Sequence, residues 1–216
     1  MGKDGVTKLI VFDLDGVIFD KDSFFEEMYD WYDRFAPKKK ILEVCDKHLR
    51  TDTKKAAELV IGGMWKGLTD QGYFEIIDDM RYNPGVEETI IDLKRKGFRT
   101  MILSSSVEHA VKKAAKALDI DYYICNKMEV KKGKITGNFE WNVTYTNKGK
   151  LLADFCKEKG IELKNVVCVG DNENDIPMMG EVGLSIAFNS KFAELKKHCK
   201  VVVDSNDLRE ILKYIE

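Results

Sequence analysis

The sequence predicts an α/β protein with an open, parallel, Rossmann-like sheet flanked by helices, into which an all-helical segment is inserted. Short apolar runs rich in Val, Ile and Leu recur along the chain without polar alternation, which is typical of parallel strands buried on both faces. Amphipathic segments separate these runs, as the crossover connections of a parallel sheet require. One long segment after the first run shows only helical spacing of its apolar residues.

Five apolar runs are expected to form the strands of this sheet: residues 8–13, 99–104, 165–171, 183–188 and 200–204. Four amphipathic segments are expected to form helices beside it: residues 84–97, 106–119, 147–160 and 206–216. We expect Asn206 to cap the last helix, because an Asn side chain accepts hydrogen bonds from the free N–H groups at a helix start.

Two segments depart from this alternation. Residues 21–83 contain "DSFFEEMYDWYDRF" and "KKAAELVIGGMW", whose spacing predicts helices and no strand. Residues 125–143 contain "VKKGKITG", which predicts two short strands around a turn at Lys132 and Gly133. We therefore expect residues 1–20 and 84–216 to form the α/β core and residues 21–83 to form a separate helical domain.

The charge balance and the cysteines restrict the partners and the location of the protein. The 216 residues include 35 basic and 37 acidic side chains, so the formal charge of −2 implies no bulk attraction to nucleic acid or to an anionic membrane. The five cysteines are scattered and form no C-x-x-C pair, which indicates reduced thiols. The sequence has neither a signal-peptide pattern nor an apolar run long enough to span a bilayer. We expect a cytoplasmic protein without a nucleic-acid or membrane partner, and the oligomeric state stays open.

Polar side chains follow the predicted strands at the edge where ligands bind in open α/β sheets. The candidate site residues are Asp13 and Asp15 after the first strand, Ser104 at the end of the second, Asp171 at the end of the third, Asn174 and Asp175 shortly after it, and Lys148 at a helix start. Carboxylates crowd together only where a cation or protons neutralise them, and oxygen ligands of this kind suit Mg²⁺. A lysine and a hydroxyl beside them can bind an anion. The sequence therefore predicts a site for phosphate and magnesium.

The same residues suggest a mechanism. An aspartate that contacts Mg²⁺ can attack phosphorus and form an aspartyl phosphate, and a second carboxyl group can protonate the leaving oxygen and then activate water. Asp13 is the better candidate for the nucleophile because it ends the strand. Asp15 lies in the loop, where it could reach the leaving group.

These motifs resemble those of a known family. "DLDGV", Ser104, Lys148 and "GDNEND" look like the four ordered motifs of the haloacid dehalogenase-like hydrolases, and the helical insertion matches the position of their C1-type cap. The segments "NKMEVKKGKITG", "NKGKLL" to "GDNENDIPMM" and "DLREILKYIE" look most like the phosphoserine phosphatase branch. The resemblance implies a haloacid dehalogenase-like core and a Mg²⁺-dependent phosphatase of a small phosphorylated metabolite.

The resemblance also implies a role for each candidate residue. Asp13 would be the nucleophile and a metal ligand, and Asp15 the general acid and base, with its backbone carbonyl on the metal. Ser104 and Lys148 would bind the transferring phosphoryl group, with Asn174 in the same network. Asp171 would bind the metal directly, whereas Asp175 would act through water or by holding Lys148.

The resemblance is weaker for the substrate. Asp22 stands where the phosphoserine enzymes place an acidic residue that holds the substrate amine. Their cap arginine, which holds the substrate carboxylate, corresponds to a position near Ile61, and Ser105 and Ser106 replace two glycines. Two alternatives stay open: a phosphoserine phosphatase in which another basic residue, Arg50 or Arg81, holds the carboxylate, and a phospho-acceptor signalling domain. The signalling domain would need neither an acid/base at Asp15 nor a helical insertion.

Overall fold

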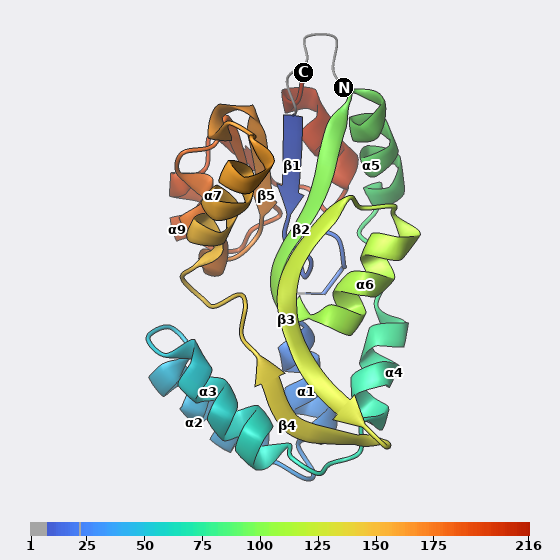
Figure 1. Cartoon of the computed structure of the whole chain (residues 1–216), viewed down its shortest axis with the longest axis vertical. Coiled ribbons are helices and arrows are strands. Elements are labelled where there is room, and N and C mark those ends of the chain that lie inside the picture. The colour runs from blue at the N-terminus through green and yellow to red at the C-terminus, as the bar shows by residue number, and fades with distance from the viewer. Residues whose placement is uncertain (1–7, 22) are drawn as a thin grey trace.

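The core of the protein is a seven-stranded sheet with the strand order β4-β3-β2-β1-β5-β6-β7, as Figure 1 shows for its central part. The structure is a computed structural model that describes residues 8–21 and 23–216. The strands are β1 (Lys8–Phe12), β2 (Phe98–Val107), β3 (Tyr122–Lys131), β4 (Lys134–Glu140), β5 (Val166–Gly170), β6 (Leu184–Phe188) and β7 (Val201–Val203). Every neighbouring pair is parallel except β3 and β4. The predicted open α/β fold is confirmed.

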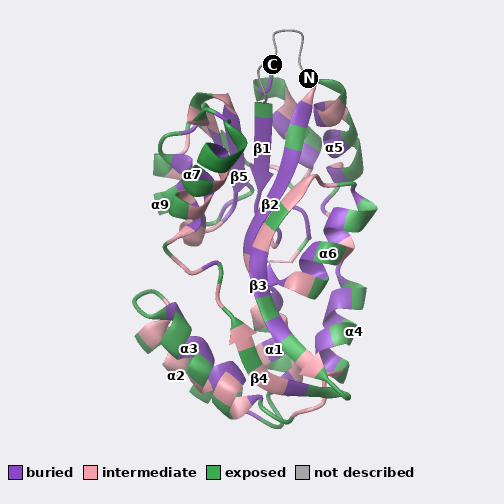
Figure 2. Cartoon of the chain, viewed as in Figure 1, coloured by how far each residue is buried: buried purple, intermediate pink, exposed green. Residues whose placement is uncertain are grey.

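Both faces of the central strands are buried, which explains why their sequences lack polar alternation. In β1, Leu9 and Val11 pack in the hydrophobic core on one face, whereas Ile10 and Phe12 pack in the core on the other. All four side chains are fully buried, and Figure 2 shows β1 as an almost continuously buried strand. The protein is therefore a three-layer structure with the sheet in the middle.

Helices cover the two faces of the sheet. The core with Ile10 and Phe12 includes residues of α5 (Val86–Arg95), α6 (Glu108–Ala117) and the 3₁₀ helix η4 (Leu208–Tyr214). The core with Leu9 and Val11 includes residues of α7 (Lys148–Lys159), α8 (Ile176–Met179) and α9 (Ala193–His198). Two further 3₁₀ helices, η2 (Leu163–Asn165) and η3 (Glu173–Asp175), precede and follow β5.

The described residues between 21 and 83 form helices and no strand, as their spacing predicts. They comprise α1 (Phe24–Tyr32), α2 (Lys38–His48), α3 (Thr53–Leu59), the π-helical turn η1 (Val60–Met64) and α4 (Gln71–Asp79). Tyr32, Trp65 and Tyr73 are fully buried. We call this part of the chain the helical segment. In Figure 1, α1, α2 and α3 lie beyond the carboxyl ends of the central strands.

The predicted hairpin is present, with Lys132 and Gly133 between the paired residues Lys131 and Lys134. The five predicted parallel strands are present, and the hairpin belongs to the same sheet, because β3 begins at Tyr122 and its first half pairs in parallel with β2. The start of β3 lacks the continuous buried run of a central strand. Tyr123, for example, is 40 % exposed.

The hairpin also binds the helical segment. Gly67 N donates to Ile135 O, Ile135 N donates to Leu68 O, and Asp70 N donates to Gly133 O, at 2.8 to 3.1 Å. The bent strand pair β3–β4 therefore belongs to the sheet at one end and supports the helical segment at the other (Figure 1).

The C-terminal helix differs from the prediction in type and in its cap. η4 is a 3₁₀ helix, and Asp207 caps it in place of Asn206. The Asp207 carboxylate accepts a hydrogen bond from Arg209 N and pairs with the Arg209 guanidinium. This short-range pair gives Asp207 more interactions at the helix start than Asn206 has in the described structure.

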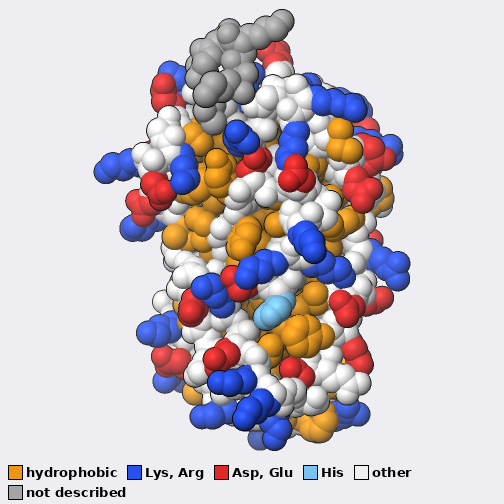
Figure 3. Space-filling view, turned by 45° about the vertical axis from the view of Figure 1, so that its right-hand side comes forward, with side chains coloured by type: hydrophobic (Ala, Val, Ile, Leu, Met, Phe, Trp, Pro, Cys, Tyr) orange, Lys and Arg blue, Asp and Glu red, His pale blue; other side chains and the backbone are white. Residues whose placement is uncertain are grey.

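The surface agrees with the balanced composition. On the face in Figure 3, acidic and basic side chains of the described residues are intermixed, and no continuous basic surface is visible. No helix in the described part of the chain is long and apolar enough to cross a membrane. All five cysteines are unpaired.

Candidate active site

The carboxyl ends of β1 and β5 bring three aspartates together. Asp13 follows β1 and Asp171 follows β5, and these two strands are neighbours in the sheet. Asp13 N donates to Val169 O at 3.0 Å, which extends this pairing to the strand end. One carboxylate oxygen from each of Asp13, Asp171 and Asp175 lies within 4.8 Å of the others. The convergence of strand ends therefore produces the cluster of acids that the sequence predicts.

Two glycines make this close approach possible. Gly16 has φ +75°, and a Cβ atom there would lie 2.2 Å from Asp171 Oδ2. A Cβ atom at Gly170 would lie 2.4 Å from Asp175 Oδ2. Any side chain at either position would displace an acid of the cluster, and Gly16 also has a backbone conformation that other residues rarely adopt.

Lys148 lies inside the cluster as the first residue of α7 and is fully buried. Its Nζ is 2.8 Å from Asp13 Oδ2 and 2.6 Å from Asp175 Oδ1. Burial alone would lower the pKa of Lys148, but the negative charges of Asp13 and Asp175 hold that pKa above its usual value. The site therefore contains a permanent positive charge between two carboxylates.

Asp175 uses both carboxylate oxygens to hold its neighbours. Oδ1 accepts from Lys148, and Oδ2 accepts from the backbone N–H groups of Asp171 at 3.0 Å and Asn172 at 3.1 Å. Burial raises the pKa of Asp175 to about 6, although Lys148 acts in the opposite direction. These contacts favour the alternative in which Asp175 positions Lys148 and the loop after β5.

Fewer interactions offset the burial of the Asp171 carboxylate than offset the burial of Asp175. It is 8 % exposed, and burial together with the charges of Asp175 and Asp13 raises its pKa well above the usual value. A carboxylate in such surroundings is stabilised by a cation.

Asp15 lies in the loop after β1 and connects the site to the helical segment. Its Oδ2 accepts a hydrogen bond of 3.0 Å from the backbone N–H of Phe24, the first residue of α1. Its Oδ1 is buried and has no hydrogen-bond partner among the described residues. Burial raises the pKa of Asp15 to about 7, and the charge of Asp13 adds to this effect. Asp15 can therefore hold or release a proton near neutral pH.

Ser104 and Asn174 lie beside the acids on two different elements. Ser104 is buried in β2, and its Oγ accepts from Ser106 N at 3.2 Å. Asn174 belongs to η3 and donates through Nδ2 to Ser105 Oγ at 3.4 Å, while its Oδ1 is buried without a partner among the described residues. The side chain of Ser106 is also buried with an unpartnered Oγ. Buried polar atoms without partners are typical of a site that binds a ligand.

The donors in this cluster fit a hard divalent cation. Asp13, Asp171 and Asp175 offer carboxylate oxygens at close range, and the orphaned Oδ1 of Asp15 lies in the same loop as Asp13. Oxygen ligands with few protein neighbours suit Mg²⁺, which retains several waters and shares its site with phosphate.

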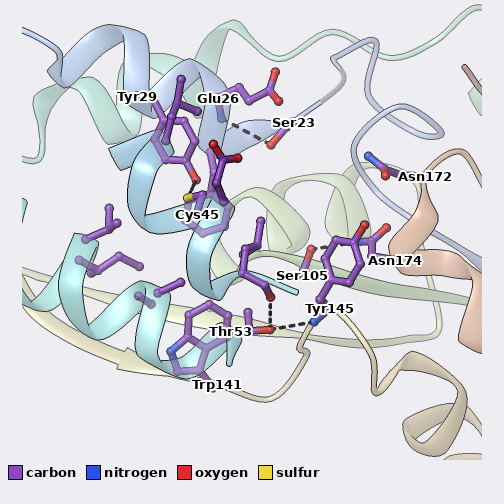
Figure 4. A pocket seen from close by; sticks show the side chains of 18 residues that line it. Ser23, Glu26, Tyr29, Cys45, Thr53, Ser105, Trp141, Tyr145, Asn172 and Asn174 are labelled. Atoms are coloured by element: carbon purple, nitrogen blue, oxygen red, sulfur yellow. Dashed lines mark hydrogen bonds between the residues drawn. The ribbon is translucent and has the colours of Figure 1, made fainter. Parts of the chain in front are cut away.

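A cavity of about 330 Å³ lies between the helical segment and the core (Figure 4), and sequence neighbours of the cluster, but not the acids themselves, line it. Helices α1, α2 and α3 and the turn η1 form one wall, and Ser105, Trp141, Tyr145, Asn172 and Asn174 form the other. Ile61 lines the first wall. It lies near the position at which the phosphoserine enzymes carry their cap arginine. Asp22 lies outside the described residues.

The two arginines considered as replacements lie elsewhere. Arg81 has an 82 % exposed side chain and pairs with Asp79. Arg50, in the loop after α2, pairs with Glu173 through Nη2 and Oε2 at 2.7 Å. Neither belongs to the cavity lining.

The sequence did not indicate that Glu173 contacts Tyr145, a residue that lines the cavity. Glu173 Oε2 also accepts from the Tyr145 hydroxyl at 3.1 Å, and the Arg50 guanidinium lies 5.5 Å from the centre of the Tyr145 ring. Tyr145 N donates to Thr53 Oγ1 at 3.3 Å. Glu173 lies inside the "GDNEND" motif, but nothing in that motif shows which distant residue faces it.

Comparisons with known proteins agree with this geometry. Residues 10–180 match the family model of haloacid dehalogenase-like hydrolases. A phosphoserine phosphatase from Methanocaldococcus jannaschii is 34 % identical over 210 residues, which cover 97 % of this chain and 98 % of that protein. A phosphoserine phosphatase from Albidiferax ferrireducens is 29 % identical, over 97 % of this chain and 90 % of the relative.

Solved structures give the same result. A phosphoserine phosphatase described as a phospho-aspartyl intermediate analogue superimposes with a TM-score of 0.83 at 31 % identity, covering 98 % of this chain and all of that one. A hydrolase of the same superfamily from Salmonella enterica has a TM-score of 0.84 at 22 % identity and covers 100 % of this chain and 74 % of its own. At that identity the second likeness shows the fold.

Proposed function

The chain belongs to the haloacid dehalogenase-like hydrolase family, as its motifs predict, and we propose that it hydrolyses a small phosphomonoester through an aspartyl phosphate on Asp13. The observation that carries this proposal is the position of the Asp13 carboxylate at the end of β1, 2.8 Å from the buried Lys148 and within 4.8 Å of Asp171 and Asp175. Membership of a hydrolase family favours the interpretation of this chain as an enzyme over that as a phospho-acceptor signalling domain.

Lys148, Ser104 and Asn174 bind the transferring phosphoryl group in this proposal. Lys148 supplies a positive charge beside Asp13, and Ser104 and Asn174 supply buried polar atoms from β2 and η3. Charge-assisted hydrogen bonds of this kind stabilise the charge on the phosphoryl oxygens during transfer. Asp175 acts as a positioning residue because it holds Lys148 and the loop that carries Asn174.

The first step forms the covalent intermediate. A carboxylate oxygen of Asp13 attacks phosphorus, the bond from phosphorus to the alcohol oxygen breaks, and Asp15 gives its proton to that oxygen. A pKa of about 7 suits Asp15 to this role, because a group that titrates near the working pH can give and take the same proton.

The second step releases phosphate. Asp15 takes a proton from a water molecule as the water oxygen attacks phosphorus, and the bond between phosphorus and the Asp13 oxygen breaks. Inorganic phosphate leaves, Asp13 is again a carboxylate, and Asp15 again carries a proton. The protein thus returns to its starting state without an additional reactant.

We assign a Mg²⁺ site to Asp13, Asp171 and the backbone carbonyl of Asp15. When bound, Mg²⁺ would offset the charge of the carboxylates and of the phosphoryl oxygens. Asp175 binds Lys148 through Oδ1 and two backbone N–H groups through Oδ2, so we propose that it contributes to the site by positioning them.

The helical segment acts as a cap domain in this proposal, with residues 21–83 over a core of residues 1–20 and 84–216. Two contacts support it: the hydrogen bond from Phe24 N to Asp15, and the ion pair between Arg50 and Glu173. A cap in this position excludes bulk water from the phosphoryl group and so protects it from side reactions.

A second candidate is a phosphoserine phosphatase. It is favoured by relatives with that name, one of which matches along almost its entire length. In both candidates the substrate is a small phosphorylated metabolite and the chemistry at Asp13 is the same.

Turnover of p-nitrophenyl phosphate with Mg²⁺ tests the proposed chemistry. We expect Asp13→Asn to reduce kcat by about 10³-fold or more, because an amide cannot replace the attacking carboxylate. Asp20→Asn is the matched control, since Asp20 is an exposed aspartate at the end of the same loop. Retained turnover in a folded Asp13→Asn variant would refute the mechanism.

A further inference from the structure

We propose, on the basis of the phosphatase function above, that the alcohol part of the substrate is apolar, carries no carboxylate and occupies the 330 Å³ cavity beside the phosphoryl site. The volume lies in the range of small-molecule sites in proteins. The cavity lies between the cap and the core, where Figure 4 shows side chains from both.

The cavity begins where the phosphoryl site ends. Ser105 in its wall follows the buried Ser104, and Asn172 and Asn174 follow and precede the acids Asp171 and Asp175. On the cap side, Ser23 lines the cavity and is the neighbour of Phe24, which binds Asp15. Although the acids themselves do not line the cavity, we infer from these neighbours that a group esterified to a phosphate at Asp13 extends into this space.

The cavity lacks a partner for a carboxylate. Among the described residues that line it there is no lysine, arginine or histidine, and the charged ones are the acids Glu26 and Asp46. Lys148 and Arg50, two cations near the site, already have anionic partners: Lys148 binds Asp13 and Asp175, and Arg50 binds Glu173. A carboxylate entering the cavity would lose its hydration without gaining a positive charge, which is strongly unfavourable.

The deeper wall is apolar. Ala56, Ala57, Val60 and Ile61 are all at least 95 % buried and line the space on the cap side. Phe25 lies beside them, and its ring contacts Trp65 in a stacked arrangement with centroids 6.5 Å apart. This wall is therefore a continuous apolar surface that packing holds in place.

Three of the hydroxyl groups at the cavity already have partners. The Tyr29 hydroxyl contacts Cys45 Sγ at 3.5 Å, Thr53 Oγ1 donates to Leu49 O at 2.8 Å, and the Tyr145 hydroxyl donates to Glu173. A polar alcohol would have to compete for these groups, whereas an apolar one gains from burial alone. The structure thus favours phosphate esters of aromatic or branched aliphatic alcohols.

Three substrates test this inference on the wild-type protein with Mg²⁺. Phosphoserine and phosphoethanolamine differ only by the carboxylate, and benzyl phosphate supplies an apolar alcohol. We expect kcat/KM to be highest for benzyl phosphate and about tenfold or more lower for phosphoserine than for phosphoethanolamine, because the carboxylate is buried without a partner. A value for phosphoserine equal to or above that for phosphoethanolamine would overturn the inference while leaving the phosphatase function intact. If the protein hydrolysed none of these three esters and did not hydrolyse p-nitrophenyl phosphate either, the phosphatase function itself would be rejected.

A new cation in the cavity provides a second test. Ile61→Arg places a guanidinium in the deep wall, and Leu42→Arg places one at a cavity position that is 41 % exposed in the wild type and so tolerates the change more readily. We expect either folded variant to raise the ratio of kcat/KM for phosphoserine to that for phosphoethanolamine by about tenfold. Val202→Arg, at an exposed position on β7, adds the same charge away from the cavity and should keep the wild-type ratio. An unchanged ratio in folded cavity variants would show that the alcohol does not enter this space.

Discussion

Asp13 and Asp15 are separated by one residue, yet their surroundings differ. Asp13 Oδ2 lies 2.8 Å from Lys148 Nζ, and its Oδ1 accepts from Leu14 N at 2.7 Å. Asp15 has a backbone N–H on one oxygen and no partner for the other among the described residues. The Asp13 side chain therefore lies directly beside a cation, whereas burial raises the pKa of Asp15 to about 7. This difference supports separate roles as nucleophile and as acid and base.

Lys148 is the residue whose loss should affect stability most. Lys148→Met would leave the buried carboxylates of Asp13 and Asp175 without their cation, so we expect the free energy of unfolding to fall by about 3 kcal/mol and turnover to be lost. Urea denaturation of the metal-free protein measures the first effect. Lys150→Met is the control, since that side chain is 76 % exposed, and it should change the free energy by less than about 0.5 kcal/mol. Equal stability of the two variants would contradict the account of the buried cluster.

Most residues of the candidate site could be predicted from the sequence, because strand ends of a parallel sheet meet at one edge. The prediction of Asp13, Ser104 and Asp171 required only this rule and the positions of three apolar runs. The partners of Asp15 and Asp175 are backbone N–H groups, which every residue carries, so no sequence pattern distinguishes them. Trp141 and Tyr145 reach the cavity from a loop, where no periodicity indicates direction.

At the scale of the elements, the central strands were the easiest to predict and the hairpin the hardest to place. β1 and β5 are buried on both faces and therefore have continuous apolar sequences. β3 is half exposed and has one parallel and one antiparallel neighbour. Its sequence therefore shows neither the continuous apolar run of a buried strand nor a regular alternation. The hydrogen bonds between the hairpin and residues 67 to 70 of the helical segment join parts of the chain that are far apart in sequence.

The contact of Arg50 with Glu173 and Tyr145 links the α2–α3 loop to the loop after β5. If this contact stabilises the closed cap, Arg50→Ala should lower kcat/KM by about three- to tenfold, because a hydrogen-bonded ion pair at a partly exposed site contributes about 1 kcal/mol. Steady-state kinetics of Arg50→Ala, Glu173→Gln and the double variant measure the effect.

The double variant should lose no more than the single variants, since all three remove the same contact. Arg81→Ala is the control, because Arg81 is an exposed arginine of the helical segment outside the cavity. Additive losses in the double variant would mean that Arg50 and Glu173 act independently.

At the scale of the whole molecule, the buried acids should make stability depend on pH and on metal. The folded-state pKa values of Asp15, about 7, and Asp175, about 6, lie above the ordinary value of 3.8. The folded protein therefore binds more protons than the unfolded chain in this range, so its stability decreases as the pH rises. We expect the metal-free protein to lose about 1 to 2 kcal/mol of unfolding free energy between pH 6 and pH 8.

Mg²⁺ should reduce this loss. A cation that binds the folded state holds the acids in their ionised form and adds stability in proportion to the logarithm of its concentration. Chemical denaturation at pH 6 and pH 8, with chelator or with Mg²⁺, tests this. The same pH dependence in both conditions, or greater stability of the metal-free protein at pH 8, would contradict the assigned cluster.

The central claim is that catalysis proceeds through a phosphoryl group on Asp13, and its most direct test is to trap that group. The protein is mixed with p-nitrophenyl phosphate and Mg²⁺, quenched in acid within the first turnover and mapped by peptide mass spectrometry. Asp15→Asn should accumulate the intermediate, because it lacks the base that activates water for the second step. We predict one phosphoryl group per chain on the peptide with Asp13, and none after Asp13→Asn. A phosphoryl group on another residue, or turnover with none on Asp13, would contradict the account.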